Sequence, residues 1–206
     1  MTTTPLSGTI VDAAGRGRKA RIAGLAADHS ARAMTNSDDS GRWQLLRDTT
    51  VTTVVGVWSE EGIAAISAVA TADVRLVLPR TMTCRFDFEG AGSNTQIWLD
   101  PVQIDHFDDA LIAALHAGPE RSIVLHVGSF DAIANRALQL QPGRYRFSGG
   151  RIALHPGGEP GLAVSEVVDL SNGQPLAREA GDRLLDIRQD GHYRVSFTAL
   201  SGAERA

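Results

Sequence analysis

Residues 37–45 read Ser-Asp-Asp-Ser-Gly-Arg-Trp-Gln-Leu, and this stretch decides the fold that the sequence predicts. Its first five residues are small or polar and end in Gly41, a composition that is typical of a tight turn. The next four residues alternate, so Trp43 and Leu45 point to one side of a strand and Arg42 and Gln44 to the other. We therefore expect a turn followed by a strand that places an aromatic ring and a leucine in a core.

Short strand patterns surround this stretch between residues 6 and 79. We expect strands at residues 6–12, 20–25, 31–35, 42–46, 51–58, 63–69 and 73–78. Residues 51–58 form a nearly continuous apolar run rich in valine, which indicates a strand buried on both faces. About seven short strands in about 75 residues is the spacing of a β-sandwich.

This segment resembles the carboxypeptidase regulatory-like domain, a prealbumin-type (transthyretin-like) β-sandwich. The family opens with a strand G-x-V/I-x-D and a glycine turn, matched here by Gly8, Ile10 or Val11, Asp12 and Gly15. Its second signature, T-D-x-x-G-x-F-x-L, is matched by Ser37, Asp38, Gly41, Trp43 and Leu45. Ser replaces Thr and Trp replaces Phe, while the family's proline phrase before the second strand is absent. The resemblance implies a fold with Trp43 inside it, and it transfers no catalytic residue.

A second domain is expected from residue 81 to residue 206. Period-two patterns predict strands at residues 84–88, 97–99, 123–127, 144–147, 151–154, 162–170, 184–187 and 193–198. We expect Asp100-Pro101 to end one strand, and the Gly149-Gly150 pair to join two others as a hairpin. A helix should begin at an Asp105 N-cap, and a second one is possible at residues 129–137. The predicted fold is mainly β: two β-sandwich-like domains in tandem, 1–80 and 81–206, the second with one or two short helical insertions.

Composition narrows the functional class. The chain has 206 residues and a formal net charge of −4, so it offers no basic face for nucleic acid. Cys84 is the only cysteine, which rules out an internal disulfide, and its alternation with Phe86 and Phe88 places it in a core. No apolar run of about 20 residues predicts a membrane span. No signal peptide precedes the first strand, so we expect a cytoplasmic protein if Met1 is the native start; a secreted mature form also fits.

Two groups of residues offer metal chemistry. Residues 36–41 place oxygen donors before a glycine, as in a calcium loop, but Arg47 occupies the position that needs an acid, which favours a plain turn. Asp105, His106 and Asp109 form the densest group of ligand types, and a strand histidine could complete a metal site. The candidates for that fourth ligand are His126, His155 and His192. Helix capping explains the carboxylates equally well.

Two tryptophans remain outside the family pattern. Trp58 and Trp98 could form an exposed platform that binds a carbohydrate or a peptide. Only 5% of the chain is aromatic, which is lean for a carbohydrate-binding module. The competing interpretation, which we favour, buries both rings between sheets or between domains.

The sequence favours a non-catalytic β-sandwich scaffold or protein-interaction module, such as an assembly subunit, that uses no cofactor. It contains no nucleophile elbow, phosphate loop, dinucleotide fingerprint or CxxC pair, so we predict that it is not an enzyme. Exposed strand edges and flat sheet faces of such sandwiches suit a protein partner or a homo-oligomer. The alternatives are a carbohydrate- or peptide-binding module that uses exposed Trp, and a metal-dependent enzyme built on the Asp105 group.

Overall fold

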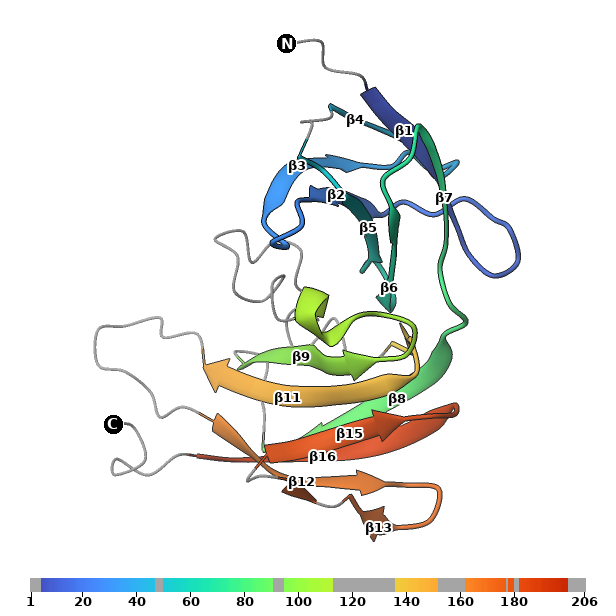
Figure 1. The fold of residues 1–206 in the computed structure, drawn as a ribbon. Coiled ribbons are helices and arrows are strands. Elements are labelled where there is room, and N and C mark those ends of the chain that lie inside the picture. The colour runs from blue at the N-terminus through green and yellow to red at the C-terminus, as the bar shows by residue number, and fades with distance from the viewer. Residues whose placement is uncertain are drawn as a thin grey trace. The chain divides into compact units, whose positions relative to one another are not determined.

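The computed structural model describes residues 5–46, 50–90, 95–112, 136–151, 162–176, 178–179 and 182–199. Within these ranges the chain forms strands β1–β16 and one helical turn at residues 109–112, which confirms the predicted mainly β, sandwich-type class. It divides into two compact units, Met1–Thr81 with Gln103–Val124 and Met82–Val102 with Leu125–Ala206 (Figure 1). That the segments 1–80 and 81–206 are separate domains stays a prediction.

The first unit contains the seven strands that the sequence predicts. They are β1 (Pro5–Val11), β2 (Arg21–Leu25), β3 (Ala31–Asn36), β4 (Arg42–Leu46), β5 (Thr53–Trp58), β6 (Gly62–Val69) and β7 (Asp73–Val77). One sheet has the order β4-β1-β7, with β1 antiparallel to β4 and parallel to β7. The other runs β3-β2-β5-β6 and is antiparallel throughout.

Trp43 lies in the core of this unit, as predicted, with 4% of its surface exposed. Gly8 of β1 lies directly opposite it in the register between β1 and β4. A Cβ atom at Gly8 would lie 2.6 Å from the indole ring and 2.0 Å from the backbone oxygen of Val74. Glycine at this position therefore gives the indole the space that it fills.

The strand predicted to be buried on both faces is β5. Successive strand residues point to opposite faces of a sheet, and Val54 and Val55 are both completely buried. The flanking strands show the same pattern at Ile22 and Ala23 and at Ile63 and Ala64. The four-stranded sheet is therefore covered on both sides along this part of its width.

The second unit is built around one large sheet with the order β15-β11-β12-β16-β8-β10. Its strands are β8 (Met82–Glu89), β10 (Leu138–Leu140), β11 (Gly143–Arg151), β12 (Leu162–Asp169), β15 (Asp182–Ile187) and β16 (Gly191–Ala199). Strand β9 (Thr95–Ile104) pairs with β11, β13 (Gln174–Pro175) with β12, and β14 (Arg178–Glu179) with β15. The ring centroids of Phe86 and Phe147 lie 5.1 Å apart, and those of Phe86 and Tyr193 5.7 Å apart, in its aromatic core.

Two predicted breaks in this segment are wrong. Strand β11 runs straight through Gly149-Gly150 instead of turning back as a hairpin, and Gly149 pairs with Leu162 of β12. Glycine accepts the extended conformation as readily as a turn, and the neighbouring strand decides between them. Strand β9 likewise continues through Asp100-Pro101, because the fixed φ of proline is compatible with extended backbone.

The predicted helix start is also wrong by three residues. Asp108, not Asp105, is the N-cap: its Oδ1 accepts a hydrogen bond from the backbone N–H of Ala110 at 2.8 Å. Before it, the N–H of Phe107 donates to the carbonyl of Ile104 at 3.3 Å, and His106 has a positive φ of 63°. This turn occupies the place where the helix was expected to begin. The predicted strand at residues 123–127 and residues 129–135 of the predicted second helix lie outside the described residues, and residues 136–137 are not helical.

Candidate interaction site

Trp58, one of the two proposed ligand-binding tryptophans, is buried with 5% of its surface exposed. The guanidinium carbon of Arg18 lies 5.4 Å from the ring centroid, in the geometry of a cation–π contact. Little of this ring is therefore exposed for a sugar or peptide to stack on, and a ligand-binding role for the two tryptophans stays a prediction. Trp98 belongs to β9, and its side chain lies outside the described part of the structure.

The proposed metal ligands Asp105 and His106 lie in the turn before the helical turn, and Asp109 is its first residue. Among the described residues, no group of three or more His, Cys, Asp or Glu side chains is arranged to hold a metal ion. His192 has a different partner, since its Nε2 lies 3.0 Å from Oδ2 of Asp87. His126 and His155 lie outside the described residues.

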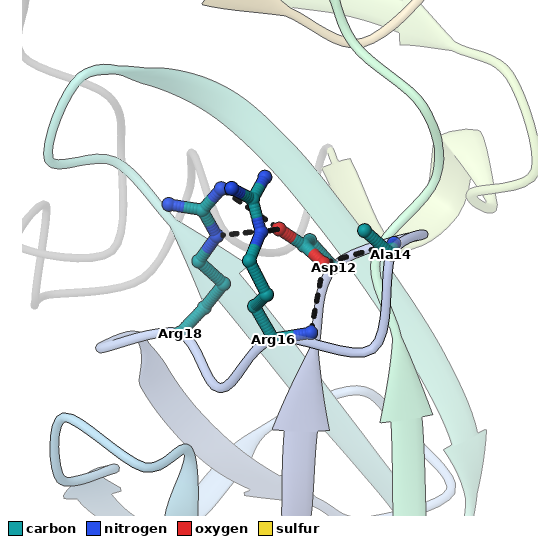
Figure 2. A network of polar contacts seen from close by, with 4 residues as sticks. All are labelled: Asp12, Ala14, Arg16 and Arg18. Atoms are coloured by element: carbon teal, nitrogen blue, oxygen red, sulfur yellow. Dashed lines mark hydrogen bonds and ion pairs between the residues drawn. The ribbon is translucent and has the colours of Figure 1, made fainter.

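The loop after β1 is closed by the carboxylate of Asp12 (Figure 2). Its Oδ1 accepts the backbone N–H groups of Ala14 at 2.9 Å and Arg16 at 3.0 Å. Its Oδ2 lies 2.9 Å from Nε of Arg16 and 2.8 Å from Nη2 of Arg18. Desolvation opposes ionisation, but the hydrogen bonds from Arg16 and Arg18 outweigh it and lower the pKa of Asp12 to about 2. This carboxylate is fully engaged in holding the loop.

The loop between β3 and β4 repeats this geometry. Asp38 Oδ1 accepts the N–H groups of Ser40 and Arg42, both at 2.9 Å, and the N–H of Gly41 donates to the Asp38 carbonyl at 2.9 Å. The same bonds join Asp12 to the residues two, three and four positions after it. In the stretch that resembled a calcium loop, this carboxylate oxygen therefore serves the turn.

The residue three positions after the first residue of each loop has left-handed backbone. Gly15 and Gly41 have φ values of 80° and 78°, in the two loops that begin with aspartate. A third loop, at residues 26–30, closes with a bond of 2.9 Å from the N–H of His29 to the Ala26 carbonyl, and His29 takes the left-handed position with φ 63°. At Gly41 a Cβ atom would also lie 2.0 Å from the carbonyl oxygen of Ile10.

Ser37, the first of residues 37–45, is buried and forms several hydrogen bonds with the backbone. Its hydroxyl accepts the N–H of Ala20 at 2.7 Å and donates to the carbonyl of Arg18 at 2.7 Å. Its own N–H donates to the Ala20 carbonyl at 2.9 Å. Ser37 and Asp38 of the motif thus hold loops and strands together through hydrogen bonds to the backbone.

The outer edge of β3 is open to another molecule. In the part of the chain that the structure describes, β3 is paired with β2 on one side and with no strand on the other. Four of its six residues are exposed: Ala31, Arg32, Met34 and Asn36. Ala33 is partly buried and packs against the core. The sequence predicted that some edge would be exposed but did not identify which one.

No family model matches the sequence, and no curated protein matches it. Solved structures with some similarity include the TIE protein of Bacillus anthracis, with a TM-score of 0.26 and 10% identity over 97% of this chain. The chain spans 34% of the length of that protein.

Two pilins are similar at the same level. The major pilin protein T-13 of Streptococcus pyogenes has a TM-score of 0.25 and 9% identity, over 97% of this chain and 98% of the pilin. The shaft pilin spaA of Lactobacillus rhamnosus GG has a TM-score of 0.28 and 9% identity, over 97% of this chain and 100% of the other. Likenesses of this size carry no conclusion about this chain.

Within the described residues, no helix has the length and apolar character needed to cross a membrane.

Proposed function

We propose that this protein is a non-catalytic interaction module, and that its first unit receives a strand from a protein partner at the free edge of β3. The observation that carries the proposal is the state of that edge: six residues, mostly exposed, with one charged side chain and no proline. Natural sheets commonly protect their edges with charges or proline, because unpaired N–H and C=O groups invite another strand. Strand β3 has no proline, and its one charge and its bulge both fall at Arg32, so the edge from Ala33 to Asn36 is suited to strand addition.

The other sheet of this unit is a weaker candidate. Its edge strand β7 carries Asp73 and Arg75 among five residues, and both are exposed. Charges of this kind oppose the close approach of another strand. Strand β4 begins with exposed Arg42 and has five residues. The length and composition of β3 therefore favour it over both.

We further propose that residues 6–79 form a carboxypeptidase regulatory-like domain. Support comes from the roles of the motif residues: Ser37 and Asp38 fix the loop, Gly41 permits its backbone, and Trp43 fills the core. Nε1 of Trp43 is buried and has no hydrogen-bond partner within the described residues. An indole N–H without a partner is what one expects where the family pattern calls for phenylalanine.

The native mass of complexes in the source cell tests the proposed interaction. We expect the wild-type protein in assemblies heavier than its 21.9 kDa chain, and we expect Met34→Lys to release it from them. The matched control is Leu46→Lys, which places the same charge at a 74% exposed apolar position on β4. A wild-type protein that always migrates as a single 21.9 kDa chain would contradict the proposal.

A further inference from the structure

We propose that the strand received by β3 is β3 of a second copy of this chain, paired antiparallel about a two-fold axis at Met34. This inference rests on the proposed function and names the partner for the same edge. The result would be one continuous sheet that joins the two four-stranded sheets β3-β2-β5-β6 of the copies. Closed two-fold pairing is the commonest form of homo-oligomer.

The two faces of β3 limit how it can pair with itself. Ala33 packs against the core, whereas Met34 is 37% exposed on the opposite face. A two-fold axis perpendicular to the sheet keeps each face on its own side, and residues directly opposite each other share a face. The axis must therefore lie midway between one residue of β3 and the same residue of the second copy. Any other position would pair neighbouring residues, which point to opposite faces.

Repulsion between like charges excludes the register in which the axis is centred on Arg32. Centring the axis on Arg32 would place two guanidinium groups directly opposite each other, which is destabilising. Centring it on Ala33 would set Arg32 against the apolar Met34. Centring it on Met34 pairs the two methionines, places Ala33 opposite Thr35, and brings Arg32 opposite the amide of Asn36, which can accept its hydrogen bonds.

The backbone favours the same centre. The register between β2 and β3 is regular from Ala33 to Asn36 and shifts at Arg32, because Gly24 pairs with Ala33 and Leu25 with Ala31. A bulge of this kind increases the local twist and disrupts an edge. The Met34 register keeps its three central residues in the regular part of the strand, whereas the Ala33 register draws on the bulged end.

The size of the contact predicts its strength. Five residues on each side would pair, and stable protein interfaces bury about 1,200–2,000 Å² in total. A short strand pair supplies only part of such an area, so we expect a reversible dimer that forms with rising concentration. The formal net charge of −4 on each copy is too small to oppose it strongly.

Cysteine cross-linking tests the register directly. Met34→Cys would face its own copy, where opposite Cβ atoms lie about 4.5–5.5 Å apart, close to the reach of a disulfide. The native Cys84 does not interfere, because it is completely buried, and burial and the nearby Asp190 raise its pKa to about 12. With oxidised glutathione as the oxidant, we expect Met34→Cys to form at least ten times more covalent dimer than the control Gln44→Cys, which is exposed on β4.

A mixed experiment keeps the test independent of that one variant. Arg32→Cys and Asn36→Cys should cross-link when mixed, because these positions face each other, and neither should cross-link alone. If neither Met34→Cys nor the mixture exceeds the Gln44→Cys control, the self-pairing is wrong. If, in addition, the wild-type protein is found in heavy complexes in the cell and Met34→Lys is not, β3 binds another protein. In that case only the identity of the partner is overturned.

Discussion

At the scale of single residues, several polar side chains of the first unit hold the backbone in place through hydrogen bonds. Asp12, Asp38 and Ser37 each form hydrogen bonds with two or more backbone groups, and the N–H of Ala20 that Ser37 accepts is buried. A buried N–H or C=O left without a partner costs about 1–3 kcal/mol. The motif that identified the fold therefore marks positions where the chain needs a specific hydrogen-bonding group or an unusual backbone angle.

Two glycines separate the effect of backbone angle from that of close packing. Gly15→Ala introduces a side chain at φ 80°, with no atom within 4 Å of the new Cβ, so we expect a loss of about 1 kcal/mol in the free energy of unfolding. Gly41→Ala has a similar angle but places its Cβ 2.0 Å from the Ile10 carbonyl oxygen, so the loss should be clearly larger. Urea unfolding of the two variants measures the difference, and equal losses would contradict the packing argument.

The carboxylate of Asp12 should make the first unit sensitive to acid. Its pKa falls from 3.8 to about 2 in the folded protein, so the ionised form stabilises the fold above pH 4. That contribution is lost as the pH falls from about 4 to 2, and screening at the surface limits it to about 1 kcal/mol. We expect Asp12→Asn to be less stable than wild type at pH 6 and close to it at pH 2.

Urea unfolding at the two pH values checks this expectation. The matched control is Asp39→Asn, which removes the same charge from an exposed turn residue. If the stability difference between Asp12→Asn and wild type is the same at both pH values, the loop carboxylate has no special role.

At the scale of elements, the start of β11 depends on one buried hydroxyl. Tyr145 is completely buried, and its hydroxyl donates to the backbone carbonyl of Gln141, four residues earlier, at 2.5 Å. Sandwich domains use such a tyrosine corner to fix the entry of a strand. We expect Tyr145→Phe to lower the free energy of unfolding by about 1–2 kcal/mol, because this one hydrogen bond is lost while the ring still fills the core.

Thermal unfolding of the second unit measures this loss. Phe147→Leu, which also changes a buried aromatic of β11 but touches no hydrogen bond of the corner, gives the cost of altered packing alone. If Tyr145→Phe is as stable as the wild type, the hydroxyl does not stabilise the start of β11.

The elements also show what the sequence could and could not predict. The seven strands of the first unit were predictable, because alternation and turn residues are local signals that agree with the packing. Gly149-Gly150 and Asp100-Pro101 were misread because a glycine or proline permits a turn without requiring it, and pairing partners far along the chain decide. The N-cap moved from Asp105 to Asp108 for a related reason, since three aspartates within five residues give the same local signal.

The candidate site was harder to predict than the fold. Which strand has a free edge depends on sheet order, and sheet order is a property of the assembled chain that no local pattern records. The burial of Trp58 depends likewise on residues far away in the sequence, such as Ile10 and Leu76 of the same core cluster and Arg18, which lies over its ring. The sequence could predict that an edge would be available, but the structure was needed to assign it to β3.

At the scale of the whole molecule, self-association should be visible in the stability of the first unit. A contact made only by the folded state raises apparent stability with protein concentration. We expect the melting temperature of the wild type to rise over a hundredfold increase in concentration, and that of Met34→Lys to stay constant. Leu46→Lys should behave as the wild type does; a constant melting temperature for all three would argue against self-association.

The double burial of β5 has a consequence for how the first unit opens. Its backbone is hydrogen-bonded to β2 on one side and β6 on the other, and apolar side chains cover both faces at Val54 and Val55. Deuterium can reach its amides only when the surrounding structure comes apart. These amides should therefore exchange last, at a rate that reports global unfolding of this unit, while those of the edge strand β3 exchange through small local fluctuations.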